Sequence, residues 1–308
     1  MEKVANEVIY RAFGFSLRSK IHFPELLVVD SYGDSIDIEI ELRDLSNLWL
    51  ELSNSKSRFV INESQVIFKV SDIAIFLIED GRRITVSPLN EYKEDVIRLY
   101  LLGSCMGAIL MQRGIYPLHG SAIAINGKAY GIIGDSGAGK STLASAFLNK
   151  GYQLLTDDII GVYFTKDNIP MVIPSYPQQK LWKESLMEFG IDNKGFRPIY
   201  QRETKFAIPI DGQFSTAPLP LAGLFELTLI ENEEIEFKQI EGLYCLQTLL
   251  IHTYRNLLIQ NLGLTDWHFT NSTKIINKVN MYKLHRPKNS FTANELVSIM
   301  LSQINKEN

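Results

Sequence analysis

Short apolar stretches separated by turn residues fill the first part of the chain. The segments EVIYRAFGFSL, DSIDIEIEL, SQVIFKV, AIFLI and RRITVSP are rich in β-branched and aromatic residues, with turn signals such as EDGR between them. This pattern is typical of strands. No catalytic constellation stands out here. We expect an N-terminal β-rich domain over residues 1–90, which either packs on the rest of the chain or docks a peptide.

A helical pattern follows the strands. Apolar side chains recur at helical spacing between Tyr92 and Arg113, and Gly114 is suited to end a helix. The segment LYLLGSCMGAILM within it is too short to cross a bilayer, so it predicts a buried helix. We expect residues 91–114 to link two domains.

Strands and helices alternate after Tyr116. LHGSAIAINGKAYGIIG predicts a hairpin around Asn126-Gly127, a dipeptide suited to a type I′ turn. KSTLASAFLNK predicts a helix, and YQLLTDDIIGVYF predicts the next strand. We further predict a helix in QQKLWKESLMEF, an irregular loop over residues 191–206, and a hairpin of AGLFELTLI with IEFKQI. Residues 115–308 therefore predict an α/β domain.

Composition narrows the class of protein. The 308 residues carry a net charge of −4 with no basic block, which argues against non-specific nucleic-acid binding. The only cysteines, Cys105 and Cys245, fit a reducing compartment. The first ten residues, MEKVANEVIY, lack an apolar signal core. We expect a cytoplasmic protein that binds neither nucleic acid nor membrane.

One motif names a ligand. Residues 134–141 read GDSGAGKS, which satisfies G-x-x-x-x-G-K-[ST] between a predicted strand and a predicted helix. Backbone N–H groups in such a loop converge on phosphate oxygens at a helix N-terminus. Lys140 would reach the β- and γ-phosphates, and Ser141 would ligate Mg²⁺. The expected nucleotide-binding residues are Gly134, Asp135, Ser136, Gly137, Ala138, Gly139, Lys140, Ser141 and Thr142.

Two carboxylates lie inside an apolar strand pattern. Adjacent strand residues point to opposite faces, and an unpaired carboxylate is costly to bury. We therefore expect Asp157 and Asp158 to lie where the strand frays, near the phosphates. One acid would serve Mg²⁺, and the other would accept a proton from an incoming hydroxyl. His119, in LHGSA, would share a proton with an aspartate, or would be structural.

Together, LHGSA, GDSGAGKS and LLTDD resemble the C-terminal kinase domain of HPr kinase/phosphorylase over residues 115–165. The resemblance implies a phosphoenolpyruvate-carboxykinase-like P-loop fold, with a mixed β-sheet flanked by helices. It implies ATP and Mg²⁺ as cofactors, Asp157 helped by His119 as the general base, and Asp158 with Ser141 as metal ligands. That family's arginine-containing loop and N-terminal domain have no visible counterparts, which argues against HPr as the acceptor.

A further resemblance covers nearly the whole chain. YRAFGFSLRSKIHFPEL, LLGSCMGAILMQRGIYPLHGSA, PSYPQQKLWKESL and PLPLAGLFEL look like the HPr-kinase-like enzymes of lasso-peptide gene clusters. These phosphorylate the C-terminal serine of a precursor peptide, so such a peptide is the implied partner. A homo-oligomer is expected from the resemblance alone, since HPr kinase assembles as a hexamer.

Phosphoryl transfer needs a further cation where charge develops. Lys205 occupies a position where the resembling enzymes carry a lysine, and Arg255, in HTYRNLL, is a second candidate. Either would stabilise the transition state or hold a peptide carboxylate. Each would otherwise be a solvated surface charge.

Three functions remain open on the sequence alone. The first is a kinase for a serine hydroxyl in a peptide tail, and the second is a kinase for free serine or another small alcohol. The third is a nucleotide-binding regulator that transfers nothing. The carboxylate pair favours the two kinases, because a regulator needs a metal-holding acid but no base.

Overall fold

The structure is a computed structural model that describes residues 7–29, 35–54, 58–62, 64–90 and 92–307. Residues 1–6, part of the segment that lacks a signal core, lie outside this description. Contacts divide the chain into two compact units. The first comprises Met1–Pro117 and Arg255–His268, and the second comprises Leu118–Tyr254 and Phe269–Asn308. The segment expected to link two domains thus belongs to the first unit, together with a later segment of the chain.

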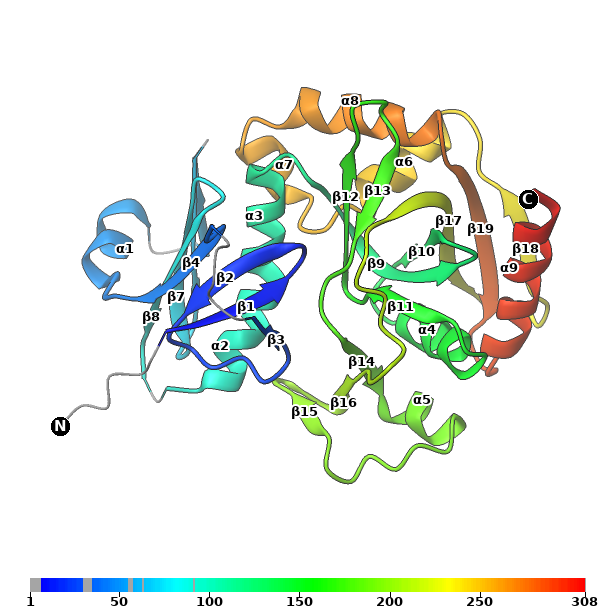
Figure 1. Cartoon of the computed structure of the whole chain (residues 1–308), viewed down its shortest axis with the longest axis horizontal. Helices are drawn as coiled ribbons and strands as arrows, with labels where there is room; N and C mark the ends of the chain where they lie inside the picture. The colour runs from blue at the N-terminus through cyan, green and yellow to red at the C-terminus, as the bar shows by residue number, and fades with distance from the viewer. Residues whose placement is uncertain (1–6, 30–34, 55–57, 63, 91, 308) are drawn as a thin grey trace. The chain divides into compact units, whose positions relative to one another are not determined.

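The first unit is rich in β-structure. Its eight-stranded sheet has the order β3-β1-β2-β4-β8-β7-β6-β5 (Figure 1). The strands are β1 Val8–Ala12, β2 Phe15–Ser19, β3 Leu27–Val28, β4 Ile38–Leu42, β5 Phe59–Ile61, β6 Gln65–Val70, β7 Ala74–Glu79 and β8 Arg83–Pro88. The segment EVIYRAFGFSL is two strands rather than one, because Phe13 and Gly14 turn the chain with φ of 51° and 74°.

The helices of this unit include the one expected over residues 92–113. It runs as α2 Glu94–Tyr100, a π-helical turn η1 Leu101–Cys105, and α3 Met106–Gln112. Gly114 has a φ of 70° and ends it, as predicted. The other helices are α1 Ser46–Leu52, α7 Leu257–Asn261 and the first turn of α8 Thr265–Ile276. No helix in the described ranges is long and apolar enough to cross a membrane.

The second unit is built on a mixed sheet with the order β10-β9-β12-β13-β17-β19-β18. Strand β10, the first in this order, also pairs with β17. Strand β11 pairs with β9. The strands are β9 Tyr116–Ile125, β10 Lys128–Gly134, β11 Gln153–Thr156, β12 Ile159–Phe164, β13 Pro170–Ile173, β17 Leu219–Ile230, β18 Glu236–Gln239 and β19 Asn280–Pro287. β10–β17 and β17–β19 are parallel, and β9–β10 is antiparallel.

Helices flank this sheet, so the expected α/β class is confirmed. Helices α4 Lys140–Asn149 and α9 Ala293–Glu307 share one core with β10, β17 and β19 (Figure 1). Phe147, Leu227, Leu284 and Met300 are fully buried in it. The predicted hairpin is also present, since Asn126 and Gly127 have φ of 50° and 74°. These contacts fix the end of β10 and the start of α4, the two elements that flank the glycine loop.

Three local predictions were wrong. QQKLW is a strand, β14 Gln178–Trp182, and only α5 Lys183–Glu188 is helical. The expected loop over residues 191–206 contains β15 Arg197–Ile199 and the start of β16 Arg202–Pro209, which form a sheet in the order β14-β16-β15. β17 and β18 form no hairpin, because β19 lies between them. The partners of β14, β17 and β18 are distant in the sequence, where a local pattern cannot reveal them, whereas β15 and β16 form a local hairpin that the polar sequence did not indicate.

A buried histidine in the first unit makes its stability sensitive to acid. His268 of α8 is 5 % exposed, and its Nε2 lies 2.7 Å from the hydroxyl of Tyr116. The two rings stack with centroids 4.8 Å apart. Burial lowers the pKa of His268 to about 4, so the folded chain holds a neutral imidazole at pH 7.

Mild acid should therefore weaken the folded state through His268. The pKa of an unfolded histidine is about 6.5, so the stability tied to His268 is complete above that pH. It is lost as the pH falls from there toward the folded-state value of about 4. We expect the free energy of unfolding to fall by up to about 3 kcal/mol in this window. Urea unfolding of His268→Gln should show a flatter pH dependence; an unchanged one would contradict the assignment.

Candidate active site

The glycine loop has backbone conformations that favour glycine. It joins β10 to α4, and Gly134, Gly137 and Gly139 adopt φ of 145°, 90° and 104°. A Cβ added at Gly134 would lie 2.3 Å from the carbonyl oxygen of Leu227, so no side chain fits there. Asp135, Ser136 and Gly137 form its exposed tip. The predicted strand–loop–helix setting is confirmed, and the first N–H groups of α4 lie at the end of the loop.

Lys140 folds back over the loop. Its Nζ donates to the carbonyl oxygens of Gly134 at 2.8 Å and Asp135 at 2.9 Å. The residue is only 8 % exposed. Burial lowers the pKa of Lys140 to about 8, against the opposing effect of the nearby aspartates. The loop therefore holds a desolvated ammonium group, which donates hydrogen bonds to the backbone carbonyl oxygens of the loop.

The strand after α4 breaks at the two aspartates, as predicted. β11 ends at Thr156 and β12 begins at Ile159. Asp158 adopts a φ of 79°, a backbone conformation that residues other than glycine rarely adopt. The turn lets both carboxylates lie on the same side of the sheet, which a regular strand would forbid.

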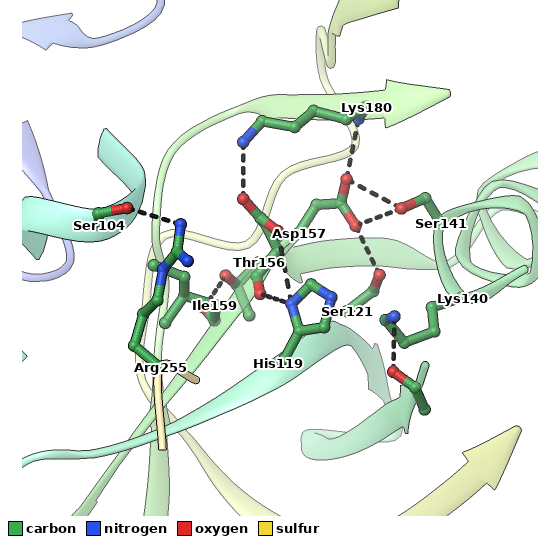
Figure 2. Close-up of polar contacts among 12 residues, drawn as sticks. Ser104, His119, Ser121, Lys140, Ser141, Thr156, Asp157, Ile159, Lys180 and Arg255 are labelled. Carbon is green, nitrogen blue, oxygen red and sulfur yellow. Dashed lines mark hydrogen bonds and ion pairs between the residues drawn. The ribbon is translucent and has the colours of Figure 1, made fainter. Parts of the chain in front are cut away.

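Asp157 is buried and accepts hydrogen bonds from three elements. Ser121 of β9 donates at 2.5 Å, and Ser141 of α4 donates at 2.9 and 3.2 Å to the two carboxylate oxygens. The backbone N–H of Lys180 in β14 donates at 2.8 Å. Figure 2 shows these groups converging on the Asp157 carboxylate. The expected metal ligand Ser141 thus contacts Asp157, and not Asp158.

Asp158 is held by the Lys180 cation instead, with the His119 ring beside it. The Nζ of Lys180 lies 2.7 Å from its Oδ2, and the Nδ1 of His119 lies 3.5 Å from its Oδ1. Burial alone would raise the pKa of Asp158, but Lys180 and His119 hold it well below its usual range. Burial would likewise lower the pKa of Lys180, and Asp158 raises it above its ordinary value. The pair is therefore fully charged at neutral pH.

His119 lies beside Asp158 rather than Asp157. Its Nδ1 is 3.0 Å from the carbonyl oxygen of Asp158, which can only accept, so Nδ1 carries the proton. The backbone N–H of His119 donates to the carbonyl oxygen of His252 at 2.7 Å. Burial lowers the pKa of His119, so the ring is neutral at pH 7. It supports the turn that presents the two carboxylates.

The two basic residues predicted for the transition state lie in different units. Lys205 of β16 pairs with Trp182 of β14, and its Nζ lies 5.4 Å from the centroid of that ring. Burial lowers the pKa of Lys205, while Asp157 and Asp158 act to raise it. Arg255 belongs to the first unit and donates to the Ser104 hydroxyl at 2.8 Å. Lys205 is therefore part of the electrostatic environment of the pair, and a role for Arg255 stays a prediction.

Sequence reasoning missed three groups at this site. Ser121 and Lys180 contact the carboxylates, and Arg286 of β19 donates from Nε to the Ala138 carbonyl oxygen at 2.8 Å. A Cβ on Gly139 would lie 3.2 Å from that same Nε. Lys180 was missed because its segment was predicted to be a helix. Only as part of strand β14 does its side chain reach Asp158. Only the position of Ser121, two residues after His119, was a local signal.

Comparison with known proteins finds similarity to solved structures only. No family model matches the chain, and no curated protein matches it. The chain is similar to the Hpr(Ser) kinase/phosphatase from Coxiella burnetii, with 14 % identity over 62 % of this chain and 99 % of that one. The TM-score is 0.33, so no activity is inferred from this similarity.

The Lys180–Asp158 pair generates a stability prediction. Lys180→Met should leave the Asp158 carboxylate partly buried without its main partner, at a cost of up to about 3 kcal/mol in unfolding free energy. The double variant Lys180→Met/Asp158→Asn should recover most of this loss, because no charge is left unpaired. Denaturant unfolding of the four proteins of this cycle gives the coupling energy. Additive losses would show that the ion pair contributes nothing.

Proposed function

We propose that this protein is an ATP- and Mg²⁺-dependent kinase that transfers the γ-phosphoryl group to a serine hydroxyl. The observation that carries the proposal is the direct contact between Ser141, the last residue of the GDSGAGKS motif, and Asp157, one of two adjacent carboxylates. A phosphate-binding loop and a pair of acids thus occupy the same site. Binding alone would need the loop and a single acid.

The donor side of the reaction fits the residues present. Mg²⁺ prefers one or two protein oxygens and keeps its remaining positions for phosphate and water. The Ser141 hydroxyl supplies one oxygen of this kind, 2.9 Å from the Asp157 carboxylate. Ser141 would hold Mg²⁺ there, and the ion would supply positive charge that offsets the charge of the phosphates. Asp158, the metal ligand expected from the sequence resemblance, contacts Lys180 instead, so its part is proposed to be electrostatic.

Asp157 is the proposed proton acceptor. Its hydrogen-bond donors are two hydroxyls and one backbone N–H, all neutral, whereas Asp158 is bound to the Lys180 cation. A carboxylate tied to a lysine is the poorer base. The serine oxygen would form a bond to the γ-phosphorus while the bond from that phosphorus to the β–γ bridging oxygen breaks. The serine proton would pass to Asp157, and ADP would leave with the bonding electrons.

Cations offset the charge that develops during transfer. Lys140 is the proposed partner of the β- and γ-phosphates, which would replace the carbonyl oxygens of Gly134 and Asp135 as its acceptors. Lys205 is proposed to stabilise the equatorial oxygens. Asp157 and Asp158 act to raise the pKa of Lys205, which indicates that its ammonium group is close enough to interact with the same site. Arg255 remains a candidate for the same role or for holding a substrate carboxylate.

The acceptor is proposed to be the C-terminal serine of a lasso-peptide precursor. The sequence segments quoted above support this choice, and the β-rich first unit offers a further domain that a free amino acid would not need. A terminal carboxylate beside the reacting hydroxyl also suits a site with several lysines.

The test is phosphorylation of defined peptides. Incubation with Mg²⁺-ATP should add phosphate, detected by mass spectrometry, to a precursor peptide that ends in serine, but not to one that ends in alanine. Asp157→Asn should lower transfer by at least about 100-fold, because general base catalysis contributes that much. The same variant should keep its ATP affinity within a few-fold in calorimetry.

Other outcomes would contradict specific parts of the proposal. Transfer to free serine alone would rule out the peptide acceptor. Binding of ATP without transfer to any alcohol would favour a regulator. Full activity of Asp157→Asn, with activity lost in Asp158→Asn, would exchange the roles of the two carboxylates.

A further inference from the structure

A cavity of about 310 Å³ opens beside the glycine loop in the second unit. Three segments line it: the loop and the start of α4, helix α5, and the chain that follows β19. Gly139 and Thr142 belong to the first segment and Glu184 to the second, while Arg286, Phe291 and Thr292 belong to the third. Its volume is within the range of small-molecule sites, at the low end.

The cavity and the carboxylates lie on different sides of the same helix turn. Consecutive residues of a helix point about 100° apart. Ser141 is directed at Asp157, whereas Thr142 lines the cavity and shares a 2.7 Å hydrogen bond with Ser185 of α5. A polyphosphate bound in the loop with one end at the carboxylates would therefore have its other end near the cavity.

The lining has the chemistry of a nucleoside site. Phe291 is 38 % exposed, and its ring meets Phe189 edge to face at 5.4 Å, which leaves a supported aromatic surface. Glu184 offers an exposed carboxylate as an acceptor for sugar hydroxyls. Arg286 places a guanidinium against the loop at Gly139, where the phosphate closest to a nucleoside would lie.

Thr292 supplies an independent observation. It is 6 % exposed, yet its Oγ1 has no hydrogen-bond partner among the described residues. A buried hydroxyl without a partner costs free energy, and such groups normally find one. The hydroxyl has almost no accessible surface, so a ligand in the cavity that Thr292 lines would supply the missing partner after the side chain rotates toward the cavity.

We propose that this cavity binds the nucleoside of the phosphoryl donor, with the base against Phe291 and a polar group of the nucleoside bonded to Thr292. The inference rests on the proposed function, since it assigns the cavity to the ATP that the kinase would use. It makes Phe291 and Thr292 binding residues for the nucleoside half alone, and leaves the phosphates to the loop.

Calorimetry with two probes separates the halves. Mg²⁺-ATP and Mg²⁺-tripolyphosphate share the phosphate chain, and only ATP carries a nucleoside. Phe291→Ala should weaken ATP binding by about tenfold, a typical loss when base–aromatic stacking is removed. Thr292→Val keeps the shape of the side chain and should weaken ATP binding severalfold. Tripolyphosphate affinity should be unchanged in both variants.

The matched control is Phe269→Ala, because Phe269 is a 58 % exposed phenylalanine in the same unit that does not line the cavity. It should bind both probes as the unmodified protein does. Equal weakening of both probes in Phe291→Ala and Thr292→Val, or no weakening of either, would overturn the nucleoside assignment.

Failure of the proposed function would look different. Lys140→Ala should lose affinity for both probes, since its target is the phosphate chain. If the unmodified protein binds neither probe, or if Lys140→Ala binds both normally, then the donor site itself is wrong. If the unmodified protein binds ATP no more tightly than tripolyphosphate, the loop stands and only the nucleoside assignment falls.

Discussion

The carboxylate of Asp157 is the point on which the second unit's site depends. It is almost fully buried, so it needs hydrogen-bond donors to offset the loss of water. Those donors come from β9, α4 and β14, three elements that are separate in the sequence. Satisfying one buried charge therefore sets the relative positions of a sheet strand, the helix that follows the glycine loop, and the strand that carries Lys180.

The adjacent carboxylate solves the same problem in a different way. Asp158 lies next in the chain, at a backbone conformation that is costly for a non-glycine residue, and is neutralised by Lys180. Lys180 therefore acts twice, through its backbone on Asp157 and through its side chain on Asp158. Two adjacent acids thus acquire distinct surroundings, one with neutral donors and one with the Lys180 cation. Different surroundings are what allow chemically identical groups to take different roles in proton transfer.

The sequence predicted what is set locally and missed what is set by distant pairing. Gly134, Gly137 and Gly139 occupy conformations that glycine favours. The position of the loop between a strand and a helix could therefore be predicted from its amino-acid sequence alone. The Asn126-Gly127 turn and the strand break at the aspartates follow from equally local physics. In contrast, β14 pairs with β16 more than twenty residues later, and β19 enters between β17 and β18 from far along the chain. Lys180 and Arg286 are carried by such strands, so their place at the site could not be predicted.

Those distant strands give the loop two different sides. A glycine loop before a helix binds phosphate through its backbone, which is the same in every such loop. Here β14 brings Lys180 to the side where Ser141 meets Asp157, while β19 brings Arg286 to the side where Thr142 faces the cavity. The first side has acids and cations suited to moving a proton and a phosphoryl group, and the second has an aromatic ring and an unsatisfied buried hydroxyl. In the proposed function the local motif would therefore set where phosphate binds, and the pairing of distant strands would set which groups face each of its ends.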